Sequence, residues 1–199
     1  MSFDENKVLI QKLEEEHTVF YTPIFDCYDP NEFPNYDRRL RKRIKELSEN
    51  MNYFIRYEAL DEQNLGLNTT FLLFYEERMA GYISLCSDSI KLAEEEMREK
   101  DLPYATVPAI KIARLSIDHR FQRRGFGKRL IDFAATRAFI VRNEYCGVKF
   151  LTLDCYKHRL SYYKKFGFQQ NSNQENGDLF NLWLNVDEYL EKLDPSIYS

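Results

Sequence analysis

One block of the sequence restricts the fold more than any other, and it spans residues 101–143. Residues 101–118, "DLPYATVPAIKIARLSID", are read as one long strand, and "HRFQRRGFG" follows at 119–127. From residue 125 onward, apolar residues recur at the spacing of an amphipathic helix. A strand that enters a helix through a glycine-containing turn is typical of a sheet covered by helices. We therefore predict an α/β or α+β fold.

The apolar residues of the strand predicted over 101–118 change sides along its length. Even positions hold Ile110 and Ile112, and odd positions hold Ala113, Leu115 and Ile117. Because strand side chains alternate between two faces, we expect the apolar face to switch between residues 112 and 113. A β-bulge near Ala113 and Arg114 would do this and bend the strand, whereas burial on both faces is the alternative. Such a bend would let an extended, amide-containing ligand pair with the backbone.

The rest of the chain predicts a mixed order of helices and strands. We expect helices over 4–16, 37–58, 125–143, 159–167 and 187–193, and strands over 19–25, 69–75, 79–86, 148–156 and 178–186. Residues 90–100 are either a short surface helix or an insertion. The strands at 69–75 and 79–86 should form a hairpin. Asp37 is placed to cap one helix at its start, and Gly167 to end another.

The charge and the cysteines exclude several classes of protein. Lysine and arginine number 28 against 32 acidic residues, and the net charge of −4 argues against a protein that coats nucleic acid or membrane. The four cysteines form no C-x-x-C pair and do not cluster with the histidines, so we predict no disulfide framework and no metal site. The charged N-terminus and the lack of a long apolar run indicate a cytoplasmic protein.

Residues 122–128, "QRRGFGK", have the character of an anion site. The first N–H groups of the helix that follows lack partners within it and, with the helix dipole, attract negative charge. Gly125 and Gly127 carry no Cβ, so a phosphate can approach the backbone closely. Three cations flank them: Arg123, Arg124 and Lys128. The motif is neither G-x-G-x-x-G nor a nucleotide P-loop. An ordinary turn that needs glycine is the alternative.

Two stretches carry a resemblance to a known family. "IKIARLSIDHRFQRRGFGKRLIDFA" at 110–134 resembles the acyl-CoA-binding strand, loop and helix of the GNAT superfamily of N-acetyltransferases. "LTLDCYKHRLSYYKKFGF" at 151–168 resembles the next strand and helix of that family, which commonly ends in Tyr-x-x-x-Gly-Phe. Here these residues are Tyr163, Gly167 and Phe168. The hairpin upstream lies where the family has one.

The resemblance implies a single domain over 1–199, with an acyl-CoA-binding core at about 69–186. Its fold would be a mixed, mostly antiparallel central sheet flanked by helices, with strands that splay at the CoA site. It also implies an N-acetyltransferase that moves the acetyl group of acetyl-CoA directly to a primary amine. The residues that would bind the cofactor are Leu115, Ser116, Ile117, Gln122, Arg123, Arg124, Gly125, Phe126, Gly127, Lys128, Tyr156 and Tyr163.

The resemblance also implies roles for these residues. The pyrophosphate of acetyl-CoA would lie on the backbone of residues 123–128, and the pantetheine arm would pair with Leu115 and Ile117. The backbone N–H of Leu115 would stabilise the oxyanion, and Tyr163 would be the general acid that protonates the departing thiolate. Tyr156 stands where many relatives carry an asparagine that contacts CoA.

The general base and the acceptor are open. Some relatives carry a glutamate where this strand has Lys111; His158, Asp154, Glu58 or a chain of waters are the candidates. A toxin-like enzyme that acetylates aminoacyl-tRNA is one alternative function. "FDCYDPNEF" at 25–33, followed by a helix with six basic residues at 38–45, resembles the N-terminal part of that subgroup. A non-catalytic acyl-CoA-binding module is another alternative, and a homodimer is left open.

Overall fold

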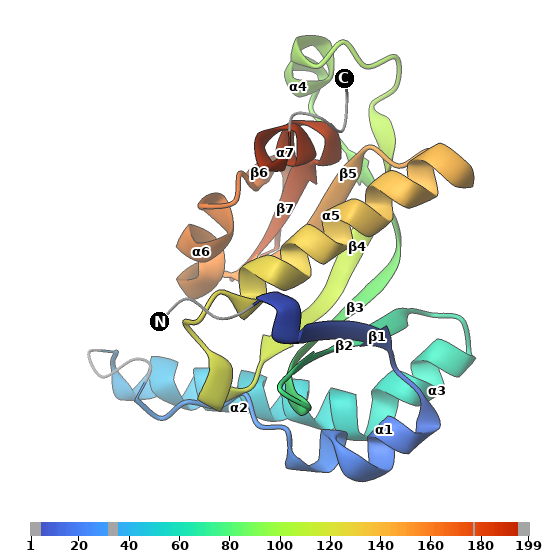
Figure 1. Ribbon diagram of the computed structural model, residues 1–199. Helices are drawn as coiled ribbons and strands as arrows, with labels where there is room; N and C mark the ends of the chain where they lie inside the picture. Colours follow the sequence, from blue (N-terminus) through green and yellow to red (C-terminus); the bar gives the residue numbers. More distant parts are fainter. Residues whose placement is uncertain (1–4, 32–35, 177, 195–199) are drawn as a thin grey trace. The chain divides into compact units, whose positions relative to one another are not determined.

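The computed structural model describes residues 5–31, 36–176 and 178–194 (Figure 1). Their strands form one mixed seven-stranded sheet in the order β1-β2-β3-β4-β5-β7-β6, with flanking helices. The strands are β1 Val8–Lys12, β2 Thr69–Tyr75, β3 Arg78–Lys91, β4 Thr106–Ile117, β5 Phe150–Tyr156, β6 Gln169–Asn176 and β7 Leu179–Asn185. The predicted combination of a mixed sheet and packed helices is confirmed.

The helices occupy the segments between the strands. The α-helices are α1 Glu15–Phe20, α2 Arg38–Tyr53, α3 Ala59–Asn64, α4 Glu94–Glu99, α5 Phe126–Glu144, α6 Leu160–Lys164 and α7 Val186–Leu193. A π-helical turn, Phe54–Glu58, joins α2 to α3, and short 3-10 turns occupy Glu5–Lys7, Thr22–Ile24, His119–Phe121 and Lys157–Arg159. No helix among the described residues is long and apolar enough to cross a membrane.

The described residues form two compact units. The first comprises the described residues of 5–84 and 114–130, and the second those of 85–113 and 131–194. The chain passes from one unit to the other within β3, β4 and α5. The single domain predicted over 1–199 stays a prediction.

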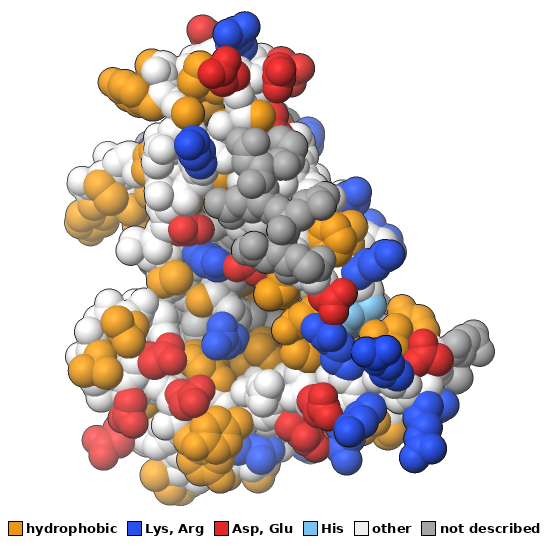
Figure 2. Space-filling model, turned by 180° about the vertical axis from the view of Figure 1, so that it is seen from behind, with side chains coloured by type: hydrophobic (Ala, Val, Ile, Leu, Met, Phe, Trp, Pro, Cys, Tyr) orange, Lys and Arg blue, Asp and Glu red, His pale blue; other side chains and the backbone are white. Residues whose placement is uncertain are grey.

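Helix α2, in the first unit, matches the sequence prediction closely. The Asp37 side chain caps it by accepting a hydrogen bond of 2.9 Å from the backbone N–H of Leu40. Ile44 is buried on its inner face. Its outer face carries six exposed cations at 38–45, and Figure 2 shows Lys and Arg side chains gathered where the helix begins.

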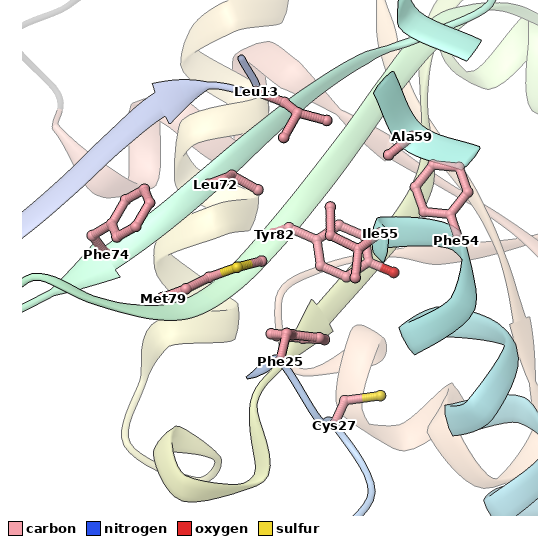
Figure 3. Packing of buried hydrophobic residues seen from close by; sticks show 10 residues of the cluster. All are labelled: Leu13, Phe25, Cys27, Phe54, Ile55, Ala59, Leu72, Phe74, Met79 and Tyr82. Carbon is pink, nitrogen blue, oxygen red and sulfur yellow. The ribbon is translucent and has the colours of Figure 1, made fainter. Parts of the chain in front are cut away.

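The core of the first unit forms between its strands and the helical segment that follows α2. Figure 3 shows Phe25, Ile55 and Tyr82 lying against one another, with Phe54 beside them. The ring centroids of Phe25 and Tyr82 are 5.4 Å apart in an edge-to-face arrangement. The buried Tyr82 hydroxyl donates a hydrogen bond of 2.8 Å to the backbone oxygen of Met51, so its polar group is satisfied inside the core.

The N-terminal predictions are wrong. The helix expected over 4–16 is a strand at Val8–Lys12, which pairs antiparallel with β2. Its backbone hydrogen bonds come from a strand some 60 residues away, which local periodicity does not reveal. The strand expected over 19–25 is instead the end of α1 and a 3-10 turn that contains Pro23. Its β-formers Val19 and Phe20 are exposed and have no place in the sheet.

The second unit is built around β5 and β7, which pair antiparallel over their whole lengths from Phe150↔Asn185 to Tyr156↔Leu179. Phe150 and Trp183 pack with ring centroids 5.0 Å apart, and Ile90 and Val107 join them in a buried cluster. The sequence did not predict β6, because "QQNSNQEN" lacks apolar alternation. Its pairing with β7 is irregular between Gln170 and Glu175.

Candidate active site

Strand β4 leaves its partner part-way along. Its parallel pairing with β5 runs from Ala109↔Phe150 to Lys111↔Thr152, although β4 continues to Ile117 and β5 to Tyr156. The burial alternation changes at the same place, because Val107 and Ala109 are buried at odd positions and Ile112 at an even one. A change of phase therefore exists, but the predicted position between residues 112 and 113 is wrong. The bulge itself stays a prediction.

The end of β4 buries a polar residue in place of its apolar neighbours. Leu115 and Ile117 are half-buried, whereas Ser116 is buried. Ser116 interacts with the buried Cys27 thiol, whose pKa is raised mainly by desolvation. At this end of β4 the inward face is therefore the even one, against the hydrophobic pattern.

The loop after β4 is shaped by two residues with left-handed backbone. Arg123 has φ of 59° and Gly125 has φ of 94°, and α5 begins immediately afterwards at Phe126. The backbone oxygen of Gly125 accepts the first helical bond, from the N–H of Arg129 at 3.2 Å. Gly125 therefore stands at the helix start, where glycine removes the strain that a Cβ would bring. Gly127 is buried in the first turn of α5.

A buried carboxylate fixes the start of this loop. Asp118 has no exposed surface, and its Oδ2 accepts hydrogen bonds from the Asp26 amide at 3.1 Å and from Arg120 Nη2 at 2.8 Å. Its Oδ1 accepts two more from Arg120, from the backbone amide and from Nε. Sequence reasoning missed this residue, because the segment at Asp26 lies 92 positions away. Asp118 ties that segment to the loop.

Two further contacts hold the same segment. Gln122 Nε2 donates to the backbone oxygens of Cys27 at 2.8 Å and Ile117 at 3.0 Å. The guanidinium of Arg123 donates to the Asp29 carboxylate at 2.5 Å. Burial opposes ionisation of Asp29, but the hydrogen bonds from Arg123 and the Asn31 amide and the charge of Arg123 together outweigh this effect, and the pKa of this carboxyl lies below its usual value. Gln122 and Arg123 are thus part of the frame of the loop.

The last loop cation rests on aromatic rings. The Arg124 guanidinium carbon lies 5.4 Å from the ring centroid of Tyr75, and within 5.7 Å of those of Phe121 and Phe126. The Phe126 side chain is buried in this cluster. Only its backbone N–H is therefore suited to binding an anion. Lys128 is exposed in the first turn of α5.

The Asp118 anchor leads to a prediction about stability. Asp118→Asn should lower the free energy of unfolding by about 2 kcal/mol, because it removes the buried charge that accepts hydrogen bonds from the Asp26 amide and from the partly exposed Arg120. Urea unfolding would measure the change. As a control, Glu76→Gln breaks the exposed ion pair with Lys7 and should cause no measurable change. If both variants unfold alike, Asp118 does not anchor the loop.

Tyr163, the predicted general acid, lies on α6 in the second unit. Its ring packs edge-to-face against Tyr162 at 5.2 Å and Phe168 at 5.7 Å. Burial raises the pKa of its hydroxyl well above the usual value, and Tyr162 and Cys155 raise it further. Among the described residues, its hydroxyl forms no hydrogen bond. The Tyr163 hydroxyl is therefore neutral, and no described residue forms a hydrogen bond with it.

The other residues predicted near Tyr163 have different surroundings. Tyr156 is half-buried and stacks on His158 at 6.2 Å. Lys111 and Asp154 form an ion pair of 2.5 Å, so neither is suited to act as a base. Glu58 is exposed in the π-helical turn. Within the described residues, no three His, Cys, Asp or Glu side chains converge to hold a metal ion.

The predicted cofactor residues thus fall into two sets. Leu115, Ser116, Ile117 and residues 122–128 belong to the first unit, where backbone geometry and a common frame hold them together. Tyr156 and Tyr163 belong to the second unit. The first set has the geometry of an anion site at a helix start, and the second provides a protonated hydroxyl in apolar surroundings.

Comparison with known proteins gives one family. Residues 40–181 match the acetyltransferase (GNAT) domain. A tyrosine-to-phenylalanine mutant of KacT superposes with a TM-score of 0.72 at 18% identity, covering 94% of this chain and 99% of that chain. AtaT complexed with acetyl-methionyl-tRNA superposes with a TM-score of 0.71 at 20% identity, covering 94% and 98%. AtaT bound to the C-terminus of AtaR and acetyl-CoA gives 0.68 at 18%, again covering 94% and 98%. At these identities the likeness shows the fold.

Proposed function

The chain belongs to the GNAT acetyltransferases, and from this premise we propose that it transfers the acetyl group of acetyl-CoA directly to a primary amine. The observation that carries the proposal is the start of α5, where Gly125 in left-handed backbone presents the first N–H groups of a long helix. Such groups, aligned with the helix dipole, bind a diphosphate without side-chain chemistry. The ion pairs of Asp118 and Arg123 keep the loop in this shape before the ligand arrives.

The end of β4 supplies the next part of the proposed site. The pantetheine arm pairs with the backbone of Leu115, Ser116 and Ile117, as an added strand would. The backbone N–H of Leu115 then donates to the oxygen of the tetrahedral intermediate. In support, β4 stops pairing with β5 at Lys111, well before β4 itself ends at Ile117.

Tyr163 is the proposed proton donor to the CoA sulfur. A hydroxyl with a raised pKa is a weak acid, so the thiolate must also be unusually basic. The buried Cys155 supports this, because desolvation and Asp154 raise the pKa of its thiol to about 11. A thiolate formed in similar surroundings would take the proton from Tyr163 more readily than one in water.

Two measurements test the proposed function. Calorimetric titration should show that acetyl-CoA binds more tightly than pantetheine, which lacks the diphosphate. Mass spectrometry of a panel of amines incubated with acetyl-CoA should show the gain of one acetyl group on at least one of them. Equal affinity for the two ligands would remove the loop from the site, and the absence of transfer to every amine would leave acyl-CoA binding without catalysis.

Aminoacyl-tRNA is a second candidate for the acceptor, and the first turns of α2 favour it. Six exposed cations lie there: Arg38, Arg39, Arg41, Lys42, Arg43 and Lys45. The helix's own ion pairs, Lys42–Glu46 and Lys45–Glu49, are both 3.7 Å long and exposed, so they engage these cations weakly. The likeness to AtaT in complex with acetyl-methionyl-tRNA makes RNA the anion to test.

A salt titration tests this acceptor. Binding of tRNA should weaken steeply with salt, and changing Arg38, Arg39 and Lys42 to Gln should reduce the slope of log K against log salt by about 2 to 3. The same change at Lys12, Lys91 and Lys192, three exposed lysines on other elements, is the control and should alter the slope little. Equal slopes for the two triple variants would exclude α2 as an RNA contact.

A further inference from the structure

In the second unit, part of the sheet carries buried apolar side chains and another part carries polar ones. The strands that supply the buried cluster of Phe150 and Trp183, together with β6, also carry six polar residues, which form two hydrogen-bonded groups. They are Asp88 on β3, Lys111 on β4, Thr152 and Asp154 on β5, Asn171 on β6 and Asn181 on β7. We call this set the polar face. Thr152 and Asn171 in it have no exposed surface.

One half of the polar face is fully occupied by its own contacts. Asp154 accepts from Lys111 Nζ at 2.5 Å on one oxygen and from Asn181 Nδ2 at 2.9 Å on the other. Asn171 Nδ2 in turn donates to Asn181 Oδ1 at 3.3 Å. Burial lowers the pKa of Lys111, but the hydrogen bond to Asp154 and the charges of Asp154 and Asp88 together outweigh this effect, and the pKa lies above the usual value. Lys111 therefore stays charged and Asp154 stays its counter-ion.

The other half contains a carboxylate that is oriented but not neutralised. Thr152 Oγ1 donates to Asp88 Oδ2 at 2.5 Å, reaching across β4, which lies between β3 and β5 in the sheet. Among the described residues, Asp88 forms no contact ion pair, and Thr152 is its one hydrogen-bond partner. A hydroxyl that fixes one carboxylate oxygen leaves the second to an outside partner.

The position of Asp88 relates it to the chemistry proposed above. Thr152 belongs to the last pair that joins β5 to β4, so Asp88 is held at the point where these two strands part. Thr152 and Asp154 lie on one face of β5, and Cys155, the neighbour of Tyr163, lies on the other. A nucleophile that enters at Asp88 and a sulfur that leaves toward Tyr163 would therefore be on opposite faces of β5.

We propose that the polar face receives the acceptor, and that the carboxylate of Asp88 binds the acceptor's ammonium group and takes its proton. This inference rests on the proposed acetyl transfer. The ammonium gives one proton to Asp88, and the neutral nitrogen attacks the thioester carbon, so that a C–N bond forms and the C–S bond breaks. The sulfur takes the proton of Tyr163, and the second proton lost by the nitrogen returns to Tyr163 through water. The polar face selects a protonated primary amine over an alcohol.

Lys111 on β4 interacts electrostatically with Asp88, and also with Asp154 on β5 and the thiol of Cys86 on β3. Lys111 is neutralised by Asp154. The one carboxylate of the polar face with no cation in contact is that of Asp88, which is why a cationic acceptor is the class of ligand it fits.

The test uses the full chain with methionine methyl ester as the amine probe. In Asp88→Asn, kcat/KM for the probe should fall about 100-fold near neutral pH. The loss of kcat/KM should become smaller as the pH rises, because the amine of the probe is then neutral and needs no base. The KM for acetyl-CoA should not change. The control Glu191→Gln removes an exposed carboxylate of α7 and should leave both constants unchanged. An Asp88→Asn enzyme within twofold of the wild type near neutral pH would overturn the inference.

Thr152 serves as a positioning residue, and its variants separate this role from folding. Thr152→Val should lower kcat/KM for the probe, and Thr152→Ser, which keeps the hydroxyl, should restore it. If Ser and Val variants are equally impaired, the hydroxyl does not orient Asp88.

A binding measurement separates this inference from the proposed function. In the isotope-labelled protein with CoA bound, methionine methyl ester should shift the NMR resonances of Asp88 and Thr152, and its hydroxyl analogue should not. Acetyl transfer that is unaffected by Asp88→Asn overturns the inference and leaves the function standing. Should the wild type acetylate no amine, the function fails, and the absence of these NMR shifts would then overturn the inference as well.

Discussion

Tyr163→Phe should lower kcat at least about 100-fold while the affinity for acetyl-CoA stays close to that of the wild type. The substitution removes only the hydroxyl, which forms no hydrogen bond among the described residues, and it keeps the ring contacts with Tyr162 and Phe168. The fold therefore loses little. The chemical step loses the donor that protonates the departing thiolate. Steady-state kinetics and calorimetric titration with acetyl-CoA measure the two quantities separately.

Tyr162→Phe is the matched control for this prediction. Tyr162 is the preceding residue on the same helix, is half-buried and packs against Phe166 as well as Tyr163. Burial also raises its pKa. The Tyr162→Phe enzyme should keep most of the wild-type kcat. Equal losses in the two variants would mean that packing in α6, and not a proton from Tyr163, supports turnover.

The raised pKa of Tyr163 also fixes the sign of a pH effect. Because the folded state favours the neutral hydroxyl, the folded pKa lies above the unfolded value of about 10. Its contribution to stability is fully present below about pH 10 and is lost as the pH rises through the folded pKa. Activity that depends on the Tyr163 proton should likewise persist to about pH 10 in the wild type.

Local patterns predicted the parts of this fold that local interactions determine. The Asp37 cap, the hairpin of β2 and β3, and the passage from β4 through glycines into α5 were all predicted from residues close in sequence. They depend on capping, turns and periodicity, which act over a few residues. The same reasoning singled out Gly125, and the resemblance to the GNAT family singled out Tyr163, because both belong to contiguous motifs; their roles in the site stay predictions.

The parts that sequence reasoning missed depend on long-range contacts. The strand β1 forms because it pairs with the edge of β2, and the change of phase in β4 buries Ser116 while Leu115 and Ile117 are only half-buried. Asp118 and Asp88 are ordinary acidic residues in the sequence. The roles proposed for them depend on hydrogen bonds with Asp26 and Thr152, which lie 92 and 64 positions away in the sequence. No spacing rule brings such pairs together.

Gly125→Val should raise the Kd for acetyl-CoA at least about tenfold, or about 1.4 kcal/mol, because the added side chain would stand where a phosphate must approach the backbone at the start of α5. The φ of 94° adds backbone strain for a β-branched residue, so the free energy of unfolding should also fall, by about 1 to 2 kcal/mol. Calorimetry measures the first effect and denaturant unfolding the second.

Gly66→Val separates the strain of Gly125→Val from its steric effect. Gly66 has φ of 74°, is exposed, and no heavy atom lies within 4 Å of an added Cβ. Valine there should lower stability by a similar amount through the same backbone strain, and it should leave the affinity for acetyl-CoA unchanged. If both variants bind acetyl-CoA equally weakly, the loss comes from general destabilisation. If both bind it as the wild type does, the diphosphate does not lie on the amides that follow Gly125, and the proposed site is wrong at its most specific point.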